Sequence, residues 1–303
     1  MSPRRSRAGL LAGAAGLRLL FPMAWLLAHL PAAVGLAVGR RIGDLLWWLL
    51  PGRRKVTLEN LRRGLGGEQS PADLRRLGRR SFQHVGMNLV EVCCYFLRPT
   101  DVMISRVRVE GREHFQQAAA QGRGVLILTA HYGNWELLAA AHGLSGLALS
   151  IVVRPLDHPL LDDLADRFRR RSGAELIVKR QAVREVLYAL RRGRMVGILL
   201  DQNATRAEGV FVPFFGVPAS TSKGLALLAL RTGAPVLPVF LRREPGGRHC
   251  MEVGPPVPPP PDGDVIAYTA RFNQVLEATI RRAPEQWLWM HARWRTQPRE
   301  AVS

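Results

Sequence analysis

The chain has 303 residues, enough for one catalytic-sized domain with a terminal appendage, and its 47% hydrophobic and 22% charged residues exclude intrinsic disorder. An excess of 43 lysines and arginines over 24 acidic residues gives a net charge of +19, which favours anionic partners such as phospholipid headgroups, acidic proteins or nucleic acid. We do not expect nucleic acid, because the basic residues are scattered and no known nucleic-acid-binding signature accompanies them. Three cysteines, two of them adjacent, exclude a disulfide framework and a CxxC metal site.

The first predicted element is a membrane segment. Residues 19–39 contain no Asp, Glu, Lys or Arg and are long enough to cross a bilayer. Pro22, Pro31 and His29 leave a kinked helix lying in the interface as the alternative, and a cleaved signal peptide as a third. More basic residues follow this segment than precede it, which predicts that the downstream domain is cytoplasmic. The chain therefore divides into a membrane anchor and interfacial segment, 1–52, and a main domain, 53–303.

The interfacial part of the anchor segment carries two adjacent tryptophans. Trp47 and Trp48 stand among leucines, a position that suits the level of the lipid headgroups. An ordinary core helix is the alternative.

The main domain begins with a helical prelude over residues 53–100. Ser70 and Pro71 are typical of an N-cap followed by proline at the first helical position, and they predict a helix to about Leu97. From residue 101 onwards, short apolar runs alternate with helical segments. Such runs are typical of a mostly parallel central sheet flanked by helices, which predicts an α/β fold with ligands at the carboxyl ends of the strands. The predicted strands are 124–130, 147–153, 174–179, 195–201 and 234–240, and a proline-rich connector at 255–264 precedes a last long helix over 264–282.

The most informative stretch, TAHYGNWE at 129–136, lies where an apolar strand ends and a helix begins. Within one continuous helix His131 and Glu136 would point apart, but Gly133 and Asn134 tolerate a tight turn that lets Glu136 face back toward His131. A carboxylate that fixes the imidazole tautomer leaves the other ring nitrogen free to take a proton from an alcohol. The residues alone leave open a general base, a loop-closing hydrogen bond or a metal site, of which the metal is disfavoured because no HxxH or HExxH spacing occurs.

The segment AHYGNWE resembles the signature of the lipid A biosynthesis (lauroyl/myristoyl) acyltransferases, which belong to the wider HxxxxD/E lysophospholipid-acyltransferase-like group. Later blocks are similar to that family in the same order, so the resemblance covers nearly the whole chain. They are Val153-Arg154-Pro155, the Lys179-Arg180 region, residues 197–202, Val212-Pro213-Phe214-Phe215-Gly216, Gly233-Ala234-Pro235 and residues 284–294.

The resemblance implies an O-acyltransferase without a metal or organic cofactor. Its donor would be acyl carrier protein, or acyl-CoA, and its acceptor a hydroxyl of an anionic membrane glycolipid, namely a lipid A precursor in outer-membrane lipopolysaccharide biosynthesis. The implied location is the bacterial inner membrane, with the catalytic domain on the cytoplasmic face. The net positive charge agrees with these partners, because such an acceptor is polyanionic and acyl carrier protein is acidic.

The resemblance also assigns catalytic roles. His131 would remove the proton of the acceptor while Glu136 orients and stabilises the imidazolium. The backbone around Gly133 and Asn134, or a helix start after Phe215-Gly216, would supply oxyanion donors.

Further residues are candidates for binding the substrate or for organising the loops around the site. Arg154 is expected to bind an anionic group or support the thioester carbonyl, with a surface ion pair as the alternative. Asp201 ends a strand, where a buried carboxylate would organise the neighbouring loops. Asn203 stands where the family often carries a second acid, which puts a chemical role at that position in doubt. Phe214 and Phe215 would wall an acyl-chain groove or pack in an aromatic core.

Two alternatives to lipid A acylation remain. The same dyad serves acylation of other lipids, such as a lysophospholipid, an amino-acid lipid or a phosphatidylinositol glycoside. A non-catalytic membrane lipid-binding scaffold is the alternative from another class, and its discriminating feature would be a lost dyad, whereas both members are present here.

Overall fold

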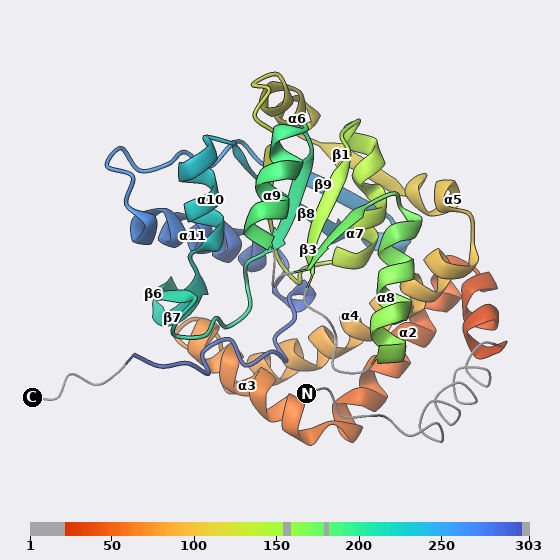
Figure 1. Cartoon of the computed structure of the whole chain (residues 1–303). Helices are drawn as coiled ribbons and strands as arrows, with labels where there is room; N and C mark the ends of the chain where they lie inside the picture. Colours follow the sequence, from red (N-terminus) through yellow and green to blue (C-terminus); the bar gives the residue numbers. More distant parts are fainter. Residues whose placement is uncertain (1–21, 154–158, 179–181, 299–303) are drawn as a thin grey trace, which may run out of the picture.

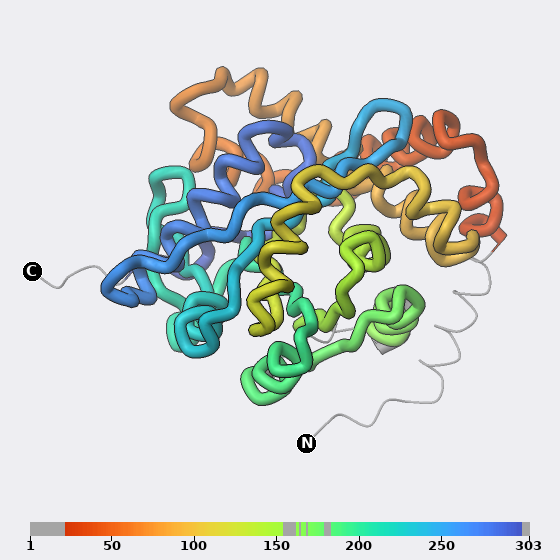
Figure 2. Tube along the Cα trace, turned by 90° about the horizontal axis from the view of Figure 1, so that it is seen from above, coloured from red at the N-terminus to blue at the C-terminus, as the bar shows by residue number. Residues whose placement is uncertain are grey.

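The computed structural model describes residues 22–153, 159–178 and 182–298 (Figure 1). A seven-stranded sheet forms the centre of the molecule, with helices against its faces. The N-terminal helices make a separate layer. Seen from above, they lie on the side of the molecule opposite the segment that holds α8 (Pro159–Arg171) and α9 (Ala182–Arg191) (Figure 2).

The sheet has the strand order β1-β9-β8-β2-β5-β3-β4. Its neighbours pair in parallel except for β8 and β9, which are antiparallel, so the predicted mostly parallel α/β sheet is confirmed. Each of the five predicted strands is present. The bounds are β1 (Val107–Glu110), β2 (Val125–Thr129), β3 (Leu149–Val153), β4 (Glu175–Val178), β5 (Met195–Leu199), β8 (Val236–Arg243) and β9 (His249–Val253).

Alternate residues of the central strands face two separate hydrophobic clusters, one on each side of the sheet. Leu126 and Leu128 of β2 belong to the cluster that α9, α10 (Gly224–Thr232) and α11 (Val265–Arg282) cover. Val125 and Ile127 belong to the other, which α6 (Arg112–Ala119) and α7 (Trp135–Ala141) cover. Burial on both faces explains why the strands read as continuous apolar runs.

A second, two-stranded sheet was not predicted. Strands β6 (Gly209–Phe214) and β7 (Val217–Ser222) form an antiparallel hairpin. Phe215 and Gly216 both have positive φ, 52° and 73°, which is the backbone of a tight two-residue hairpin turn. The expected helix start after Phe215-Gly216 is therefore wrong, since a strand begins there.

The predicted membrane segment is broken in the structure. A short helix over residues 22–29 ends just before Pro31, and α2 (Ala32–Leu49) begins after it. Proline favours this break because it lacks the backbone N–H that a continuing helix would use. None of the helices in the described ranges combines the length and the apolar character needed to cross a bilayer, so the predicted anchor helix is not confirmed.

Helix α2 packs on α4 (Pro71–Leu97) through glycines that leave no room for a side chain. A Cβ atom on Gly39 would lie 2.7 Å from the Cα of Met87, and one on Gly43 would lie 2.3 Å from the Cα of Gln83. From the other side, a Cβ on Gly86 would meet the Gly39 carbonyl oxygen at 2.1 Å. The two helices are therefore in contact backbone to backbone, as in small-xxx-small helix pairs.

The two adjacent tryptophans of α2 differ in their exposure to solvent. Trp48 is 65% exposed, as a headgroup-level position requires, but Trp47 is 2% exposed and packs edge-on against Phe82 of α4. The headgroup prediction is therefore wrong for Trp47, which belongs to the contact between the helices.

Helix α4 begins as predicted, because the Ser70 side chain accepts a hydrogen bond from the backbone N–H of Asp73. At its other end α4 runs to the residue before Arg98, also as predicted. The remaining helical elements are α3 (Pro51–Leu65), α5 (Thr100–Ile104) and the short 3₁₀ turns η1 (His142–Ser145), η3 (Pro245–Gly247) and η4 (Pro284–Gln286).

Candidate active site

The loop between β2 and α7 carries His131 at the carboxyl end of a central strand. Asn134 caps α7, since its side chain accepts a hydrogen bond from the N–H of Leu137 at 3.0 Å. Gly133 has a φ of 59°, and a Cβ there would lie 1.7 Å from the carbonyl oxygen of Leu241. The predicted tight turn is confirmed, and Gly133 is required both by its conformation and by the closeness of β8.

His131 is held by Asp201, which stands two residues after the end of β5 at Leu199. The imidazole Nδ1 lies 2.9 Å from Asp201 Oδ1, and the backbone N–H of His131 donates to Asp201 Oδ2 at 3.0 Å. Strands β2 and β5 are parallel neighbours, so their carboxyl ends bring the two residues together. Since an ionised carboxylate only accepts, Nδ1 carries a proton and the other ring nitrogen, Nε2, is the basic one.

Asp201 is 3% exposed and fully engaged. Besides its two bonds to His131, it accepts a hydrogen bond from the indole Nε1 of Trp287 at 2.8 Å. Burial alone would raise the pKa of this carboxyl group, but the charge of His131 and the three hydrogen bonds outweigh it and lower the pKa to about 2. Asp201 is therefore ionised at neutral pH, and its hydrogen bonds join the loop after β2 to the segment that contains Trp287.

The imidazole of His131 remains accessible, with 19% of its side chain exposed. Burial would lower its pKa, but the charge and the hydrogen bond of Asp201 raise it above the usual histidine range, with a smaller contribution from Glu136. On the open side, the amide nitrogen of Gln202 lies 3.3 Å from Nε2. The ring of Trp135 stands edge-on to the imidazole, 5.2 Å away between centroids.

Glu136 does not pair with His131 as the sequence predicted. Its carboxylate forms an ion pair with Arg169 of α8, with Nη2 to Oε1 at 2.9 Å and Nε to Oε2 at 3.3 Å. The physical reason is that Asp201 already occupies Nδ1 of the imidazole, while Arg169 supplies a guanidinium for Glu136. Glu136 still acts on His131 through its charge, which favours the imidazolium.

The backbone amides of Gly133 and Asn134 are not open to a substrate in this conformation. The N–H of Gly133 donates to the carbonyl of Gln286 at 3.0 Å, and the N–H of Asn134 donates to that of Leu241 at 3.1 Å. Because both donors are already used, the expected oxyanion role does not fit them, and they fix the loop instead. The carbonyl of His131 is likewise bonded, to the N–H of Leu288.

A buried polar cluster on α4 and β8, which the sequence did not reveal, holds the loop between β2 and α7. Arg243 of β8 binds Glu91 of α4 through two bonds, Nε to Oε1 at 3.0 Å and Nη2 to Oε2 at 2.5 Å. Glu91 also accepts from the Asn134 side chain at 2.6 Å. His84 and Asn88, on the same face of α4, both bond the carbonyl oxygen of Gly133. Their spacing of three to four residues along a helix is the only sequence signal for this face.

The aromatic residues proposed for an acyl groove lie in a packed cluster. Phe214 is fully buried and its ring contacts those of Phe215, Trp287 and Trp294. Phe215 is 7% exposed and lies against Trp289. The core-packing alternative is therefore correct for Phe214 and Phe215. Arg154 lies outside the residues that the structure describes.

An apolar cavity opens beside the catalytic loop, with about 510 Å³ of empty space including its mouth. Thr129 and Trp135, on either side of His131, contribute to its wall, and Leu199 contributes from the carboxyl end of β5. The hydroxyl of Thr129 has no hydrogen-bond partner among the described residues. Other lining residues are Phe115, Leu138, Ala139, Met195, Gly197 and Met251.

Among the described residues, one group of three has side-chain atoms close enough together to share a metal ion, and it lies away from His131, on strands β1 and β9. It consists of Glu110, Cys250 and Glu252. Arg108 pairs with Glu110, and Arg242 pairs with Glu252. None of these three residues forms a hydrogen bond or an ion pair with His131.

Comparison with known proteins agrees with the geometry. The family model described as "Bacterial lipid A biosynthesis acyltransferase" matches residues 7–296. The chain is 33% identical over 276 residues to a lipid A biosynthesis lauroyltransferase of Escherichia coli (strain K12), which covers 90% of this chain and 89% of that protein. It is 30% identical over 278 residues to the lipid A biosynthesis palmitoleoyltransferase of the same organism, again covering 90% and 89%. A phosphatidylinositol mannoside acyltransferase of Mycobacterium tuberculosis (strain CDC 1551 / Oshkosh) is 29% identical over 194 residues, 61% of this chain and 59% of that protein.

Proposed function

The chain belongs to the bacterial lipid A biosynthesis acyltransferase family, and from this premise we propose that it moves a fatty acyl chain from a thioester to a hydroxyl of a lipid A precursor. Its activity is that of an O-acyltransferase. Acyl carrier protein is the proposed donor, with acyl-CoA as the alternative, and the acceptor is an anionic glycolipid at the cytoplasmic face of the inner membrane. The surplus of 43 basic over 24 acidic residues supports acidic donors and acceptors of this kind.

The observation that carries the proposal is the bond between His131 Nδ1 and the buried carboxylate of Asp201. In the neutral imidazole that bond makes Nε2 the unprotonated nitrogen, on the open side of the ring, where an acceptor hydroxyl can reach it. A hydroxyl needs a base in this position in order to attack a thioester.

In the proposed reaction, Nε2 of His131 takes the proton of the acceptor hydroxyl as its oxygen bonds to the thioester carbonyl carbon. The resulting imidazolium is stabilised by the charges of Asp201 and, at longer range, Glu136. Collapse of the tetrahedral intermediate breaks the carbon–sulfur bond, and the imidazolium returns its proton to the departing thiolate. The Gln202 amide, whose nitrogen lies 3.3 Å from Nε2 of His131, is the proposed side-chain donor to the oxyanion.

The apolar cavity next to Trp135 supports an acyl chain as the transferred group. Its wall consists mainly of aliphatic side chains, methionines and aromatic rings, which is the kind of lining that an alkyl chain requires. A chain lying there would hold its carbonyl carbon near the mouth, beside His131. Binding of an alkyl chain is driven by removal of apolar surface from water.

Membrane attachment is part of the proposal. The helix over residues 22–29 and α2 expose large apolar side chains, among them Trp25 at 51%, Leu45 at 56% and Trp48 at 65%. Large apolar side chains that are exposed together are typical of interaction surfaces. Arg40 and Arg41 of α2 are also exposed, which suits anionic lipid headgroups. Salt washing separates the two modes of attachment, since release at high salt indicates charge-driven binding at the interface.

The direct test is an assay of membranes containing the parent chain or His131→Ala, with an acyl carrier protein thioester, an acyl-CoA and a lipid A precursor. We expect transfer by the parent and at least a hundredfold loss in the variant. Activity of His131→Ala close to the parent would end the general-base assignment. Mass spectrometry of total lipids from cells with and without the protein identifies the acceptor, because the product is heavier by one acyl group. A mannoside-type acceptor in that experiment would refute the lipid A assignment.

A further inference from the structure

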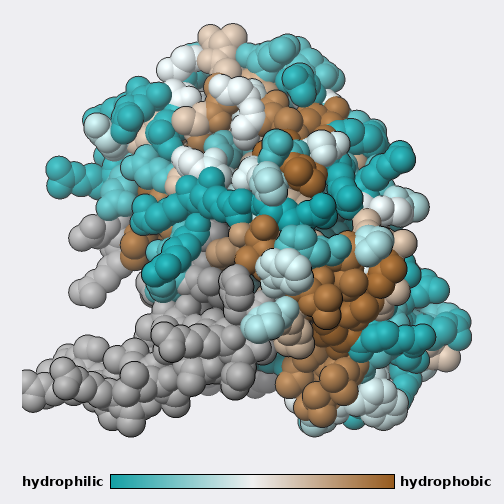
Figure 3. All heavy atoms as spheres, turned by 90° about the vertical axis from the view of Figure 1, so that its right-hand side faces the viewer, coloured by the Kyte–Doolittle hydropathy of each residue, from teal (hydrophilic) through white to brown (hydrophobic). Residues whose placement is uncertain are grey.

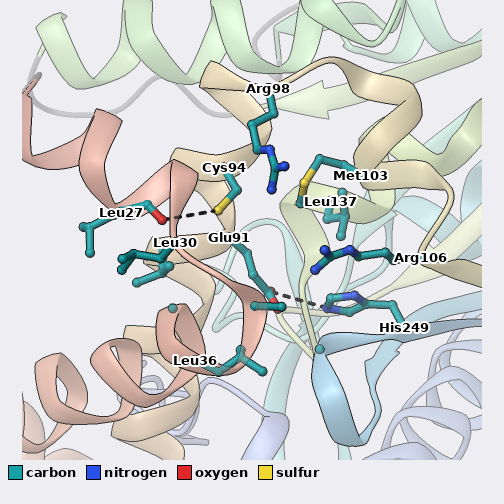
Figure 4. A pocket seen from close by; sticks show the side chains of 14 residues that line it. Leu27, Leu30, Leu36, Glu91, Cys94, Arg98, Met103, Arg106, Leu137 and His249 are labelled. Atoms are coloured by element: carbon teal, nitrogen blue, oxygen red, sulfur yellow. Dashed lines mark hydrogen bonds and ion pairs between the residues drawn. The ribbon is translucent and has the colours of Figure 1, made fainter.

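A second cavity lies between the N-terminal helices and the far side of α7. It has about 500 Å³ of empty space including its mouth, and none of the residues that bond His131 line it. The helix over residues 22–29, α2, α4, the segment after α5 and the start of β9 all contribute to the wall (Figure 4). Nothing in the acyl-transfer chemistry uses this cavity.

One wall of the cavity is apolar and belongs to the helices proposed to meet the membrane. Leu27, Leu30 and Leu36 form it. On the outside of the same helices, Trp25, Leu26 and other apolar side chains are exposed. Figure 3 shows the hydrophobic area on this side of the molecule. The apolar wall is thus continuous along the chain with the surface that we propose to face lipid.

The opposite wall is cationic. Arg98 and Arg106 point their guanidinium groups into the cavity (Figure 4). Among the described residues, neither guanidinium has a hydrogen bond or ion pair. The one carboxylate among the described lining residues, Glu91, is already neutralised by Arg243. The cavity therefore keeps an uncompensated positive charge, to which an anion would be attracted.

The floor of the cavity carries a buried histidine with unused hydrogen-bonding capacity. His249 is 2% exposed, and neither ring nitrogen meets a hydrogen-bond partner among the described residues. Its Nε2 lies 3.4 Å from Glu91 Oε2, within ion-pair distance only (Figure 4). Buried polar groups are rarely left unpaired, so this ring points to a polar ligand atom in the cavity.

We propose that this cavity binds the anionic headgroup of a membrane phospholipid. The phosphate would lie between Arg98 and Arg106, and the first carbons of the acyl chains would lie against Leu27 and Leu30. A free inorganic anion would use the cationic wall alone, and a neutral lipid the apolar wall alone, whereas an anionic lipid uses both. The inference rests on the membrane attachment stated in the proposed function, and it adds a specific lipid site to it.

The test uses the full chain and water-soluble probes in isothermal titration calorimetry: dihexanoyl phosphatidylglycerol, dihexanoyl phosphatidylcholine and inorganic phosphate. We expect phosphatidylglycerol to bind at least tenfold more tightly than either of the others. In the Arg98→Gln/Arg106→Gln variant that preference should disappear. The matched control is Arg75→Gln/Arg80→Gln, which removes the same charge from exposed positions of α4 and should bind like the parent.

A second variant tests the apolar wall. Leu30→Ser should weaken binding of phosphatidylglycerol several-fold without changing the response to inorganic phosphate, and circular dichroism melting curves check that each variant is folded. Equal binding by the Arg98/Arg106 variant and its control would overturn the proposal, as would phosphate binding as tight as phosphatidylglycerol. His131→Ala should bind the lipid like the parent, so a failure of the headgroup site and a failure of the acyltransferase mechanism give different results.

Discussion

Replacing Asp201 with asparagine tests which carboxylate controls His131. The carboxylate of Asp201 accepts three hydrogen bonds, from His131 Nδ1 at 2.9 Å, His131 N at 3.0 Å and Trp287 Nε1 at 2.8 Å. An amide offers one oxygen in place of two. If this oxygen keeps the two bonds at the Oδ2 position, the amide NH₂ faces Nδ1 of the imidazole. Nδ1 must then accept, and the proton moves to Nε2, which can no longer act as a base.

From this loss of the correct tautomer we expect kcat to fall by roughly 10²- to 10⁴-fold in Asp201→Asn. That decrease corresponds to about 3–5 kcal/mol in the activation free energy. The pH dependence gives a second readout. Asp201 raises the pKa of His131, so the parent rate should increase with pH through that raised value as the imidazole becomes neutral. In Asp201→Asn the residual rate should increase at lower pH, because the charge that raised the pKa of His131 is gone.

The assay is initial-rate acyl transfer from thioester to lipid acceptor, measured from about pH 5 to pH 9, the range in which a histidine titrates. Glu136→Gln is the matched control, since it removes the same charge but leaves the bonds of Asp201 to the imidazole intact. We expect a smaller loss of rate and a smaller displacement of the pH midpoint. If Glu136→Gln were the more damaging change, and Asp201→Asn kept the parent's pH midpoint, the assignment of the imidazole partner would be refuted.

Three further changes test the contact between α2 and α4, the cavity beside the loop and the buried ion pair of Glu91. Gly43→Val should lower the free energy of unfolding, measured in urea, by at least ~1–3 kcal/mol, because the Cβ of the valine has no space against α4. The control Gly52→Ala, at an open position, should change that free energy little. Equal losses of stability in the two variants would contradict the close packing. Ala139→Phe should shift the products toward shorter acyl chains in mass spectrometry by filling the cavity beside the loop, and an unchanged product distribution would place the chain elsewhere. Glu91→Gln should cost ~3–5 kcal/mol in urea unfolding, since it leaves the buried guanidinium of Arg243 unpaired, and a loss within error would contradict an ionised pair there.

The sheet was predictable because its strands are buried on both faces and therefore stand out as apolar runs. Strands β1 and β9 and the β6–β7 hairpin were not predicted. Strand β6 contains Pro213 and strand β7 contains Pro218, which argue against a strand in sequence, yet the two prolines face each other in a short hairpin outside the main sheet. The five residues Glu244–Arg248, which turn the chain between β8 and β9, are rich in glycine. They predict a loop but do not indicate that another strand follows.

The location of the site was predictable, but the partner of the imidazole was not. His131 and Gly133 follow an apolar strand, and the turn they form is the expected one. The spacing between His131 and Glu136 favours a local pair, whereas the observed partner, Asp201, is 70 residues away in the chain. Only the pairing of β2 with β5 brings them together, and the order of strands in a sheet is not written in any local pattern. Arg169, which pairs with Glu136, lies on α8, and no local pattern in the sequence indicates that contact either.

The segment after α11 fastens the catalytic loop at several points. Trp287 bonds Asp201, the carbonyl of Gln286 receives the N–H of Gly133, and the N–H of Leu288 bonds the carbonyl of His131. A nascent chain whose residues 286–288 are still inside the ribosomal exit tunnel lacks the indole and the carbonyl that hold the histidine loop in place. Activity should therefore begin only after these residues have left the ribosome.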